Sequence, residues 1–235
     1  MEILEIGILP VVLTLLAYQT GVILRQKIKS PVCNPILVAV ILALLFLSAT
    51  GMELKTYQAG NSVLSWLLTP ATVSLAVTLY EQFQILRKRT AMIFASVAIG
   101  AITCVLMVLG LSILFRYAPE MTISLLPKSV TTAIGVPLSE ISGGLAPITT
   151  AAIILTGITA SVLGPVLCDV FGLTDEIAQG VAYGTSGHVI GTSKAMERSS
   201  LAGAAGSLSL VVAGLLTSII LPLVISYLKN ISVMI

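Results

Sequence analysis

Two polar stretches decide how this chain folds: PKSVTTAIGVPLSE at residues 127–140 and GTSGHVIGTSKAMERS at residues 184–199. Each contains a lysine, several hydroxyl groups, glycines or prolines and a glutamate, in a chain that is otherwise almost entirely apolar. Hydrocarbon does not tolerate unpaired backbone groups or isolated charges, so such stretches persist in a membrane only where they line a cavity or are enclosed by other helices. We therefore expect the functional site in these two stretches.

The composition around them is that of a membrane protein. The chain has 235 residues, of which 57% are hydrophobic and 9% charged, with a mean hydropathy of +1.08, whereas soluble domains are about 25% charged. We predict an all-α polytopic membrane protein with one transmembrane domain over residues 1–235. The net charge of +2 is small and no basic face is clustered, so nucleic acid is not an expected partner.

Six apolar segments are long enough to cross a bilayer, which takes about 17–25 residues. They are residues 3–24, 31–49, 63–80, 91–115, 147–171 and 204–228. Two weaker segments, 121–138 and 177–195, contain the polar stretches and are predicted to be discontinuous or re-entrant helices.

Basic residues in short loops predict the orientation, because such loops stay in the cytoplasm. Residues 25–29 and 87–89 carry lysines and arginines, which places the N-terminus outside. Beyond residue 120 the orientation depends on segment 121–138. If that segment crosses the membrane, the acidic pair 175–176 falls outside and the charged stretch 194–198 falls inside.

The sequence contains one candidate for an internal repeat. Residues 70–77 and 127–134 share the pattern P-x-[ST]-V-[ST]-x-A-[VI], and a glutamate follows each, Glu81 and Glu140. Transporters are commonly built from repeated halves, with the binding site between them near the midplane. The similarity indicates either such a repeat or chance in an Ala/Val/Thr-rich background, and the sequence leaves both open.

Residues 127–140 have the chemistry of a carboxylate receptor. A helix that starts near Pro127 places free amides beside Lys128, and such a helix end attracts anions. Four side chains add donors to these amides: Lys128, Ser129, Thr131 and Thr132. The alternative is that Lys128 extends to the membrane surface, the hydroxyls bond their own backbone, and Pro127 and Pro137 only kink a helix.

Residues 184–199 contain the only histidine of the chain. On a continuous helix Thr185, His188 and Thr192 share one face. Three glycines beside that face permit close approach or an unwound centre: Gly184, Gly187 and Gly191. We expect the shared face to bind substrate, with His188 also a candidate for proton transfer, and a structural histidine is the alternative. A Lys194–Glu197 ion pair is also expected, within a site or in a cytoplasmic loop.

Glu81 and Glu140 are further candidates for proton coupling, because a carboxyl group near a bilayer can bind and release a proton. Enzymatic function is not expected, since the chain lacks the G-x-S-x-G, H-E-x-x-H and phosphate-loop motifs. One histidine and three dispersed cysteines do not form a metal-ligand cluster, so no metal or cofactor is predicted.

Four blocks of the sequence resemble the signature blocks of the LrgB/CidB family. They are TPATVSLAVTLYEQ (69–82), LLPKSVTTAIGVPLSEISGG (125–144), TGITASVLGP (156–165) and GVAYGTSGHVIGTSKAME (180–197), in the family's order and spacing. PKSVTT and the HxIGTxxA block are the most specific. The family's motif residues fall on Pro127, Lys128, Ser129, Thr131, Thr132, Glu140, Gly184, Thr185, His188, Gly191 and Thr192. The chain departs from the family pattern at Ala133, at Val136 and in the short segment 198–200, which leaves substrate identity open.

The resemblance implies a bacterial plasma-membrane protein that is usually encoded beside a smaller holin-like partner of the LrgA/CidA type. Some members are described as antiholin-like or holin-like regulators of murein hydrolases and cell lysis. Others, including a plastid relative, resemble carriers of small carboxylates such as pyruvate, glycolate and glycerate. We therefore expect a homodimeric carrier or facilitator of small monocarboxylates, with a lysis regulator as the alternative. A regulator needs a partner-facing surface, for which the small-residue run LAGAAGS at 201–207 is a candidate.

Overall fold

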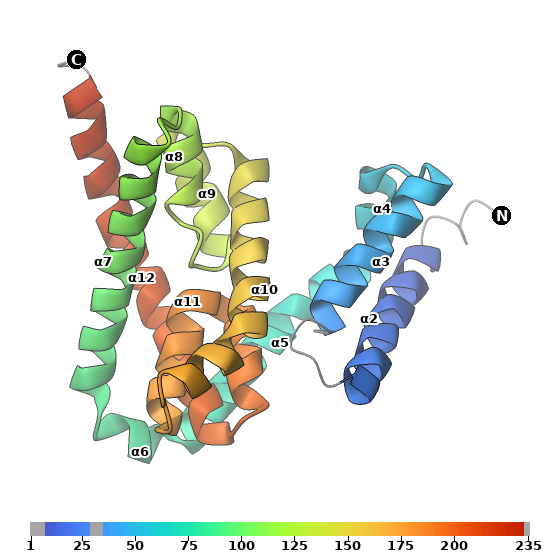
Figure 1. The fold of residues 1–235 in the computed structure, drawn as a ribbon, viewed down its shortest axis with the longest axis horizontal. Coiled ribbons are helices and arrows are strands. Elements are labelled where there is room, and N and C mark those ends of the chain that lie inside the picture. Colours follow the sequence, from blue (N-terminus) through green and yellow to red (C-terminus); the bar gives the residue numbers. More distant parts are fainter. Residues whose placement is uncertain (1–7, 29–34, 233–235) are drawn as a thin grey trace. The chain divides into compact units, whose positions relative to one another are not determined.

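The computed structural model describes residues 8–28 and 35–232, and within these ranges the chain forms helices joined by short turns, without a strand (Figure 1). The helices are α2 (Leu9–Ile28), α3 (Pro35–Thr50), α4 (Leu54–Gly60), α5 (Ser62–Glu81), α6 (Phe83–Arg87), α7 (Thr90–Leu114), α8 (Pro119–Leu125), α9 (Thr132–Ser142), α10 (Ala146–Val170), α11 (Glu176–Met196) and α12 (Ser200–Ser232). Within the described ranges, four helical segments are long and apolar enough to cross a membrane: α2, α7, α10 and Ser200–Tyr227 of α12. This confirms the predicted all-α polytopic membrane protein.

The contacts divide the chain into two compact units, residues 1–75 and 76–235, with the boundary inside α5. In the first unit, α2 and α3 cross closely, since a Cβ on Gly21 would lie 2.7 Å from the Pro35 Cα atom. The Thr14 hydroxyl lies 2.6 Å from the Tyr57 hydroxyl and ties α2 to α4. The predicted spans 3–24, 31–49 and 63–80 correspond to α2, α3 and α5, although Lys29 and parts of the first two spans lie outside the described residues. One domain over 1–235 stays a prediction.

The second unit contains the two polar stretches and has several ion pairs at one end. Arg89, just before α7, donates to Asp175, just before α11, at 2.8 Å. Arg198, just after α11, lies 4.0 Å from Asp169 near the end of α10. The start of α7, the end of α10 and both ends of α11 therefore lie together, at what we call the Arg89 end. Since α7 spans 25 residues, or about 37 Å, Leu114 lies at the opposite end.

Helix α11 is a re-entrant hairpin that leaves and returns to the Arg89 end. Its first half runs parallel to α12, because Gly180 contacts the Ala202 carbonyl and Gly184 the Gly206 carbonyl. Its second half runs antiparallel to α12, because Met196 lies against Gly203 and Thr192 against Gly206. The reversal occurs at His188, whose backbone has φ 43° and ψ −133°.

This hairpin corrects one sequence expectation. The alternative with 175–176 and 194–198 on opposite sides of the membrane is wrong, because ion pairs hold both stretches at the Arg89 end. Residues 177–195 were predicted to be discontinuous or re-entrant, and they are re-entrant.

Helices α8 and α9 form a second hairpin, which enters from the opposite end (Figure 1). The Ser124 hydroxyl on α8 accepts a hydrogen bond from the Leu145 N–H after α9, at 2.7 Å, so the chain returns to where it entered. The Thr149 hydroxyl of α10 donates to Ser139 of α9 at 2.7 Å and fixes the hairpin against α10. Residues 126–131 form the tip of this hairpin, within the unit.

Two local expectations are corrected here. Helix α9 begins at Thr132 rather than near Pro127, since Pro127 starts a turn in which its carbonyl accepts from the Val130 N–H at 3.2 Å. Pro70 lies inside α5, whereas Pro127 lies in this turn. The segments 70–77 and 127–134 thus differ in local structure, which does not support the repeat between them.

Candidate functional site

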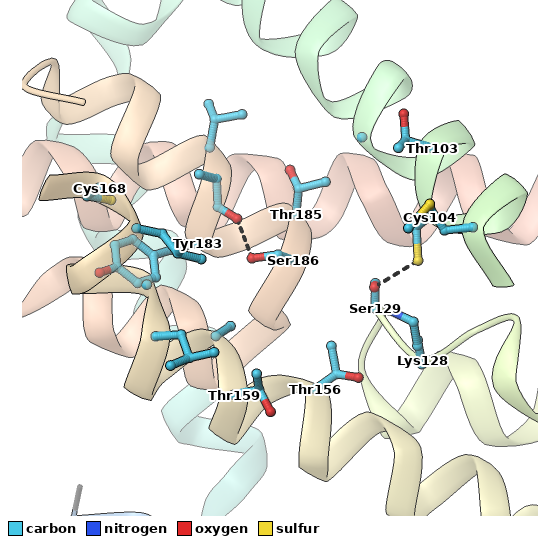
Figure 2. Close-up of a pocket in the computed structure, with 18 of the residues that line it drawn as sticks. Thr103, Cys104, Lys128, Ser129, Thr156, Thr159, Cys168, Tyr183, Thr185 and Ser186 are labelled. Carbon is cyan, nitrogen blue, oxygen red and sulfur yellow. Dashed lines mark hydrogen bonds between the residues drawn. The ribbon is translucent and has the colours of Figure 1, made fainter. Parts of the chain in front are cut away.

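A cavity of about 770 Å³ lies between α7 and α10. The tip of the α8–α9 hairpin and the first half of α11 complete its wall (Figure 2). Its lining is mainly apolar, with leucines of α10 such as Leu155 and Leu163. A set of hydroxyl groups breaks this surface: Thr103, Ser129, Thr156, Thr159, Thr185 and Ser186. Among the described residues, Lys128 is the one charged residue of the lining. Such a pocket suits a small solute with one negative charge.

Lys128 stands at the tip of the α8–α9 hairpin and is half-buried. Its backbone N–H donates to the Leu125 carbonyl at 3.2 Å, which continues the last turn of α8 into the tip. Within the described ranges no carboxylate lies within ion-pair distance of its ammonium group. A cation without a counterion in apolar surroundings is costly, and an anion that enters the pocket relieves that cost.

Two hydroxyl groups of the lining are buried without a hydrogen-bond partner, namely Thr185 Oγ1 and the Tyr183 hydroxyl. Buried polar atoms in proteins are almost always paired, with protein, water or ligand. Ser129, by contrast, is 3.2 Å from the Cys104 sulfur on α7, which anchors the hairpin tip. Figure 2 shows Lys128 and Ser129 near one end of the pocket, and Tyr183 and Cys168 near the other.

The donors of the carboxylate receptor predicted within residues 127–140 are divided by the fold. Lys128 and Ser129 line the pocket, whereas Thr131 and Thr132 do not. Thr131 is the N-cap of α9 and its side chain makes no capping hydrogen bond, so the positive end of α9 remains uncapped behind Ser129.

The shared face predicted for Thr185, His188 and Thr192 does not form. The positive φ of His188 interrupts the helix between them, so the spacing of three and four residues no longer aligns side chains. Thr185 lines the pocket, while Thr192 is fully buried and donates to the His188 carbonyl at 2.8 Å.

His188 is 5% exposed and is not part of the pocket lining. Its Nε2 lies 2.8 Å from the Ile153 carbonyl of α10. Because a carbonyl only accepts, this nitrogen carries the proton. The ring packs directly on Gly157, where a Cβ would lie 2.8 Å from Nε2. His188 therefore fixes the tip of α11 to α10, and its part in proton coupling stays a prediction.

The other predicted residues lie around the two hairpins. Glu81 and Glu140 are exposed and outside the pocket lining, and Pro137 lies inside α9. The three predicted helix-break glycines make close contacts: Gly184 with Gly206 of α12, Gly187 with Ala160 of α10, and Gly191 with the Tyr183 carbonyl within α11. The predicted Lys194–Glu197 ion pair is confirmed at 2.6 Å, at the Arg89 end.

Sequence reasoning missed several residues of the lining, notably Thr103 on α7 and Thr156 and Thr159 on α10. Single threonines in apolar helices usually bond their own backbone, as Thr159 does to the Leu155 carbonyl at 2.7 Å. The i, i+3 spacing of Thr156 and Thr159 is the available signal, because it puts both on one face of α10.

Asp175 anchors the entry to α11. It accepts from the Ala178 N–H at 2.9 Å as an N-cap and from Arg89 at 2.8 Å. The Ala178 amide and the Arg89 guanidinium hold the pKa of Asp175 below its ordinary value of 3.8. Both partners of the ion pair are about half exposed, so the pair itself contributes about 0–1 kcal/mol.

Long apolar helices, two hairpins that enter from opposite ends and a cation at one tip define a multi-pass helical membrane protein with an internal pocket. The sequence identifies the family of this membrane protein. The model of the LrgB-like family matches residues 14–227, and the chain belongs to that family.

Three relatives illustrate the match. The holin-like protein CidB of Staphylococcus epidermidis, from strains ATCC 35984 and ATCC 12228, is 32% identical over 93% of this chain and 96% of the relative. The uncharacterized protein YwbG of Bacillus subtilis strain 168 is 35% identical over 94% of this chain and 99% of the relative. No solved structure matches the chain. The family resemblance predicted from the sequence blocks is confirmed.

Proposed function

We propose that this protein is a secondary carrier or facilitator of small monocarboxylates, such as pyruvate or glycolate, across the bacterial plasma membrane. The observation that carries the proposal is Lys128, a half-buried cation without an acidic partner among the described residues, on the wall of a pocket of about 770 Å³. An LrgA/CidA-type protein is the proposed partner, and a homodimer the proposed assembly.

The chemistry of the pocket supports one negative charge in a small solute. The carboxylate pairs with Lys128 and accepts a hydrogen bond from Ser129, in surroundings where a charge-assisted hydrogen bond is strong. The hydroxyl of Thr185 is buried and unpartnered in this conformation, and we propose that it rotates to donate to a polar atom of the same solute. Because Lys128 is the one charge in the described lining, a monocarboxylate leaves the loaded pocket neutral.

The test is uptake of radiolabelled pyruvate and glycolate into liposomes that contain the purified protein. Lys128→Met should lower flux at least tenfold, and Lys128→Arg should retain part of it. Lys88→Met is the matched control, because Lys88 is exposed in the loop before α7, and it should leave flux unchanged. Equal flux in the Lys128→Met and Lys88→Met proteins contradicts the proposal.

The second candidate is a regulator of murein hydrolases and lysis, which the name of the CidB relatives favours. The partner surface first considered, residues 201–207, is not available for it. Ala202, Ala204 and Ala205 are fully buried, and α12 packs closely on α11 along this run. A regulator must therefore contact its partner elsewhere. Wild-type lysis behaviour in cells that carry the Lys128→Met protein would favour this second function.

The orientation is proposed from the basic loop. Arg87, Lys88 and Arg89 belong to the Arg89 end, so the positive-inside rule assigns this end to the cytoplasm. The same rule assigns the basic sequence at 25–29 to the cytoplasm, and we therefore propose that the N-terminus lies outside.

A further inference from the structure

Helices α7 and α10 have the same length and the same pattern of burial. Both have 25 residues, and they run in opposite directions, α7 away from the Arg89 end and α10 toward it. Five of the six buried positions of α7 have a buried counterpart on α10 that lies 56 positions later, as Thr149 follows Ile93. The pairs are Ile93/Thr149, Val97/Ile153, Ala101/Gly157, Val105/Ser161 and Ser112/Cys168.

The two helices also end in the same way. After α7, Phe115 is followed by Arg116 with φ 53°, and after α10, Phe171 is followed by Gly172 with φ 61°. The next N–H closes each helix by a hydrogen bond back to position 112 or 168, at 2.9 and 2.8 Å. This is the closure that a left-handed residue after a helix permits. Each helix then leads into a hairpin that enters from the end where the helix stopped.

The pocket is built from matching positions of these two halves. Four pairs of lining residues on α7 and α10 are 56 positions apart: Gly100/Thr156, Thr103/Thr159, Cys104/Ala160 and Met107/Leu163. The lining residues at the hairpins, Lys128 and Ser129, match Thr185 and Ser186 at 57 positions. Residues 90–142 and 146–196 therefore form an inverted repeat, and the pocket lies between its halves, where carriers bind their solutes.

The pocket breaks this symmetry in one respect. It extends along the second half to Cys168 and Leu173, at the Arg89 end. The matching residues of the first half, Ser112 and Tyr117, do not line it. Both Ser112 and Cys168 are buried, but the Ser112 hydroxyl has no hydrogen-bond partner. A hydroxyl group that is unpaired in this conformation is expected to be satisfied in another.

We propose that the two halves exchange conformations, so that the pocket opens to the opposite end along Ser112 while the path along Cys168 closes. The proposal rests on the proposed carrier function. In the second conformation Ser112 lines a water-filled path and gains hydrogen bonds, whereas Cys168 no longer borders the pocket. The two paths are never open together, and this distinguishes the proposed carrier from a continuous pore.

Thiol labelling from each face of the membrane tests the exchange. The full-length protein carries one cysteine, either Cys168 or Ser112→Cys, with the other cysteines replaced by alanine. The probe is 2-sulfonatoethyl methanethiosulfonate, which is small, anionic and membrane-impermeant. In oriented vesicles, Cys168 should react from the face of the Arg89 end and Ser112→Cys from the opposite face.

Val105→Cys is the control, because neither Val105 nor its counterpart Ser161 lines the pocket, and it should react at least tenfold more slowly from either face. Leu125→Cys, the counterpart of the lining residue Ala182, is a second reporter in case Ser112→Cys does not fold.

A protein with both Cys168 and Ser112→Cys supplies the decisive measurement. Blocking Cys168 with a bulky maleimide should slow labelling at position 112 at least tenfold. Independent labelling of both positions overturns the exchange, and if flux still depends on Lys128 the carrier function stands. Exclusive labelling without carboxylate flux would instead overturn the proposed function.

Discussion

A single added methyl group should show whether His188 holds the tip of α11. In Gly157→Ala, the new Cβ would lie 2.7 Å from His188 Cε1, 2.8 Å from Nε2 and 2.9 Å from Ile190 Cδ1. Favourable contacts between such atoms begin near 3.5 Å, so the imidazole must move. The ring is held by its 2.8 Å hydrogen bond to the Ile153 carbonyl, and movement strains or breaks that bond in a buried place.

The expected cost combines two effects. Overpacking in a closed core costs about 1–3 kcal/mol, and leaving a buried hydrogen-bonding group unsatisfied costs about 1–3 kcal/mol. The two costs are not fully additive, because movement of the ring relieves the overpacking while it breaks the hydrogen bond. We therefore expect Gly157→Ala to lower the free energy of unfolding by about 2–4 kcal/mol. The scaling for soluble proteins of this size converts 2 kcal/mol to about 4–8 °C in melting temperature.

The matched control is Gly110→Ala on α7. Nothing lies within 4 Å of a Cβ at this position. Alanine in a helix is favoured over glycine by about 0.5–1 kcal/mol, so this variant should be neutral or slightly more stable. Both variants gain the same helix propensity, so their difference isolates the contacts with His188 and Ile190.

The assay is thermal unfolding in one detergent at fixed protein concentration, followed by the loss of helical circular dichroism. Gly157→Ala should melt several degrees below the wild-type protein, and Gly110→Ala at or above it. If both variants melt together, His188 does not pack on Gly157, and the re-entrant path of α11 is refuted with it.

Three further outcomes are expected. Thr185→Val removes an unpaired buried hydroxyl at constant volume, so it should leave melting unchanged or raised while it lowers the affinity for carboxylate measured by flux. Asp175→Ala removes the cap of α11 and should cost about 0.5–2 kcal/mol at neutral pH. Because the folded-state pKa of Asp175 is lowered, its contribution is present above pH 3.8 and is lost as the pH falls through the lowered value, so wild-type and variant melting temperatures should converge in acid. If Lys128 is neutralised by substrate, exchange of internal for external carboxylate should exceed net efflux, as measured by counterflow, because the empty carrier must move an unpaired charge.

The helices could be predicted from the sequence because length and apolar character are local properties. The six predicted spans each correspond to a helix. Each polar stretch coincides with a break in helical structure, between α8 and α9 for the first and at His188 of α11 for the second. The direction of the chain beyond residue 120 could not be predicted in the same way. It depends on contacts between distant residues, such as Gly180 with Ala202 and Asp175 with Arg89, that leave no periodic signal in the sequence.

The site was predictable in part for the same reason. Lys128 and Ser129 stand out because charge and hydroxyl groups interrupt an apolar chain, and both line the pocket. The grouping of Thr185 with His188 failed because it assumed helical geometry through a residue with φ 43°. Such a conformation is uncommon outside glycine, so helix periodicity gives no warning of it.

The inverted repeat explains why one lysine is sufficient for the proposed site. Each half supplies a hairpin tip to the same pocket, but Lys128 of the first tip corresponds to the uncharged Thr185 of the second. A solute between the tips therefore meets a cation at one end and a hydroxyl group at the other. A monocarboxylate with a second polar atom satisfies both, whereas a dicarboxylate leaves one charge without a counterion in an apolar wall. The difference between the two tips, rather than the features they share, sets the charge of the solute that we propose.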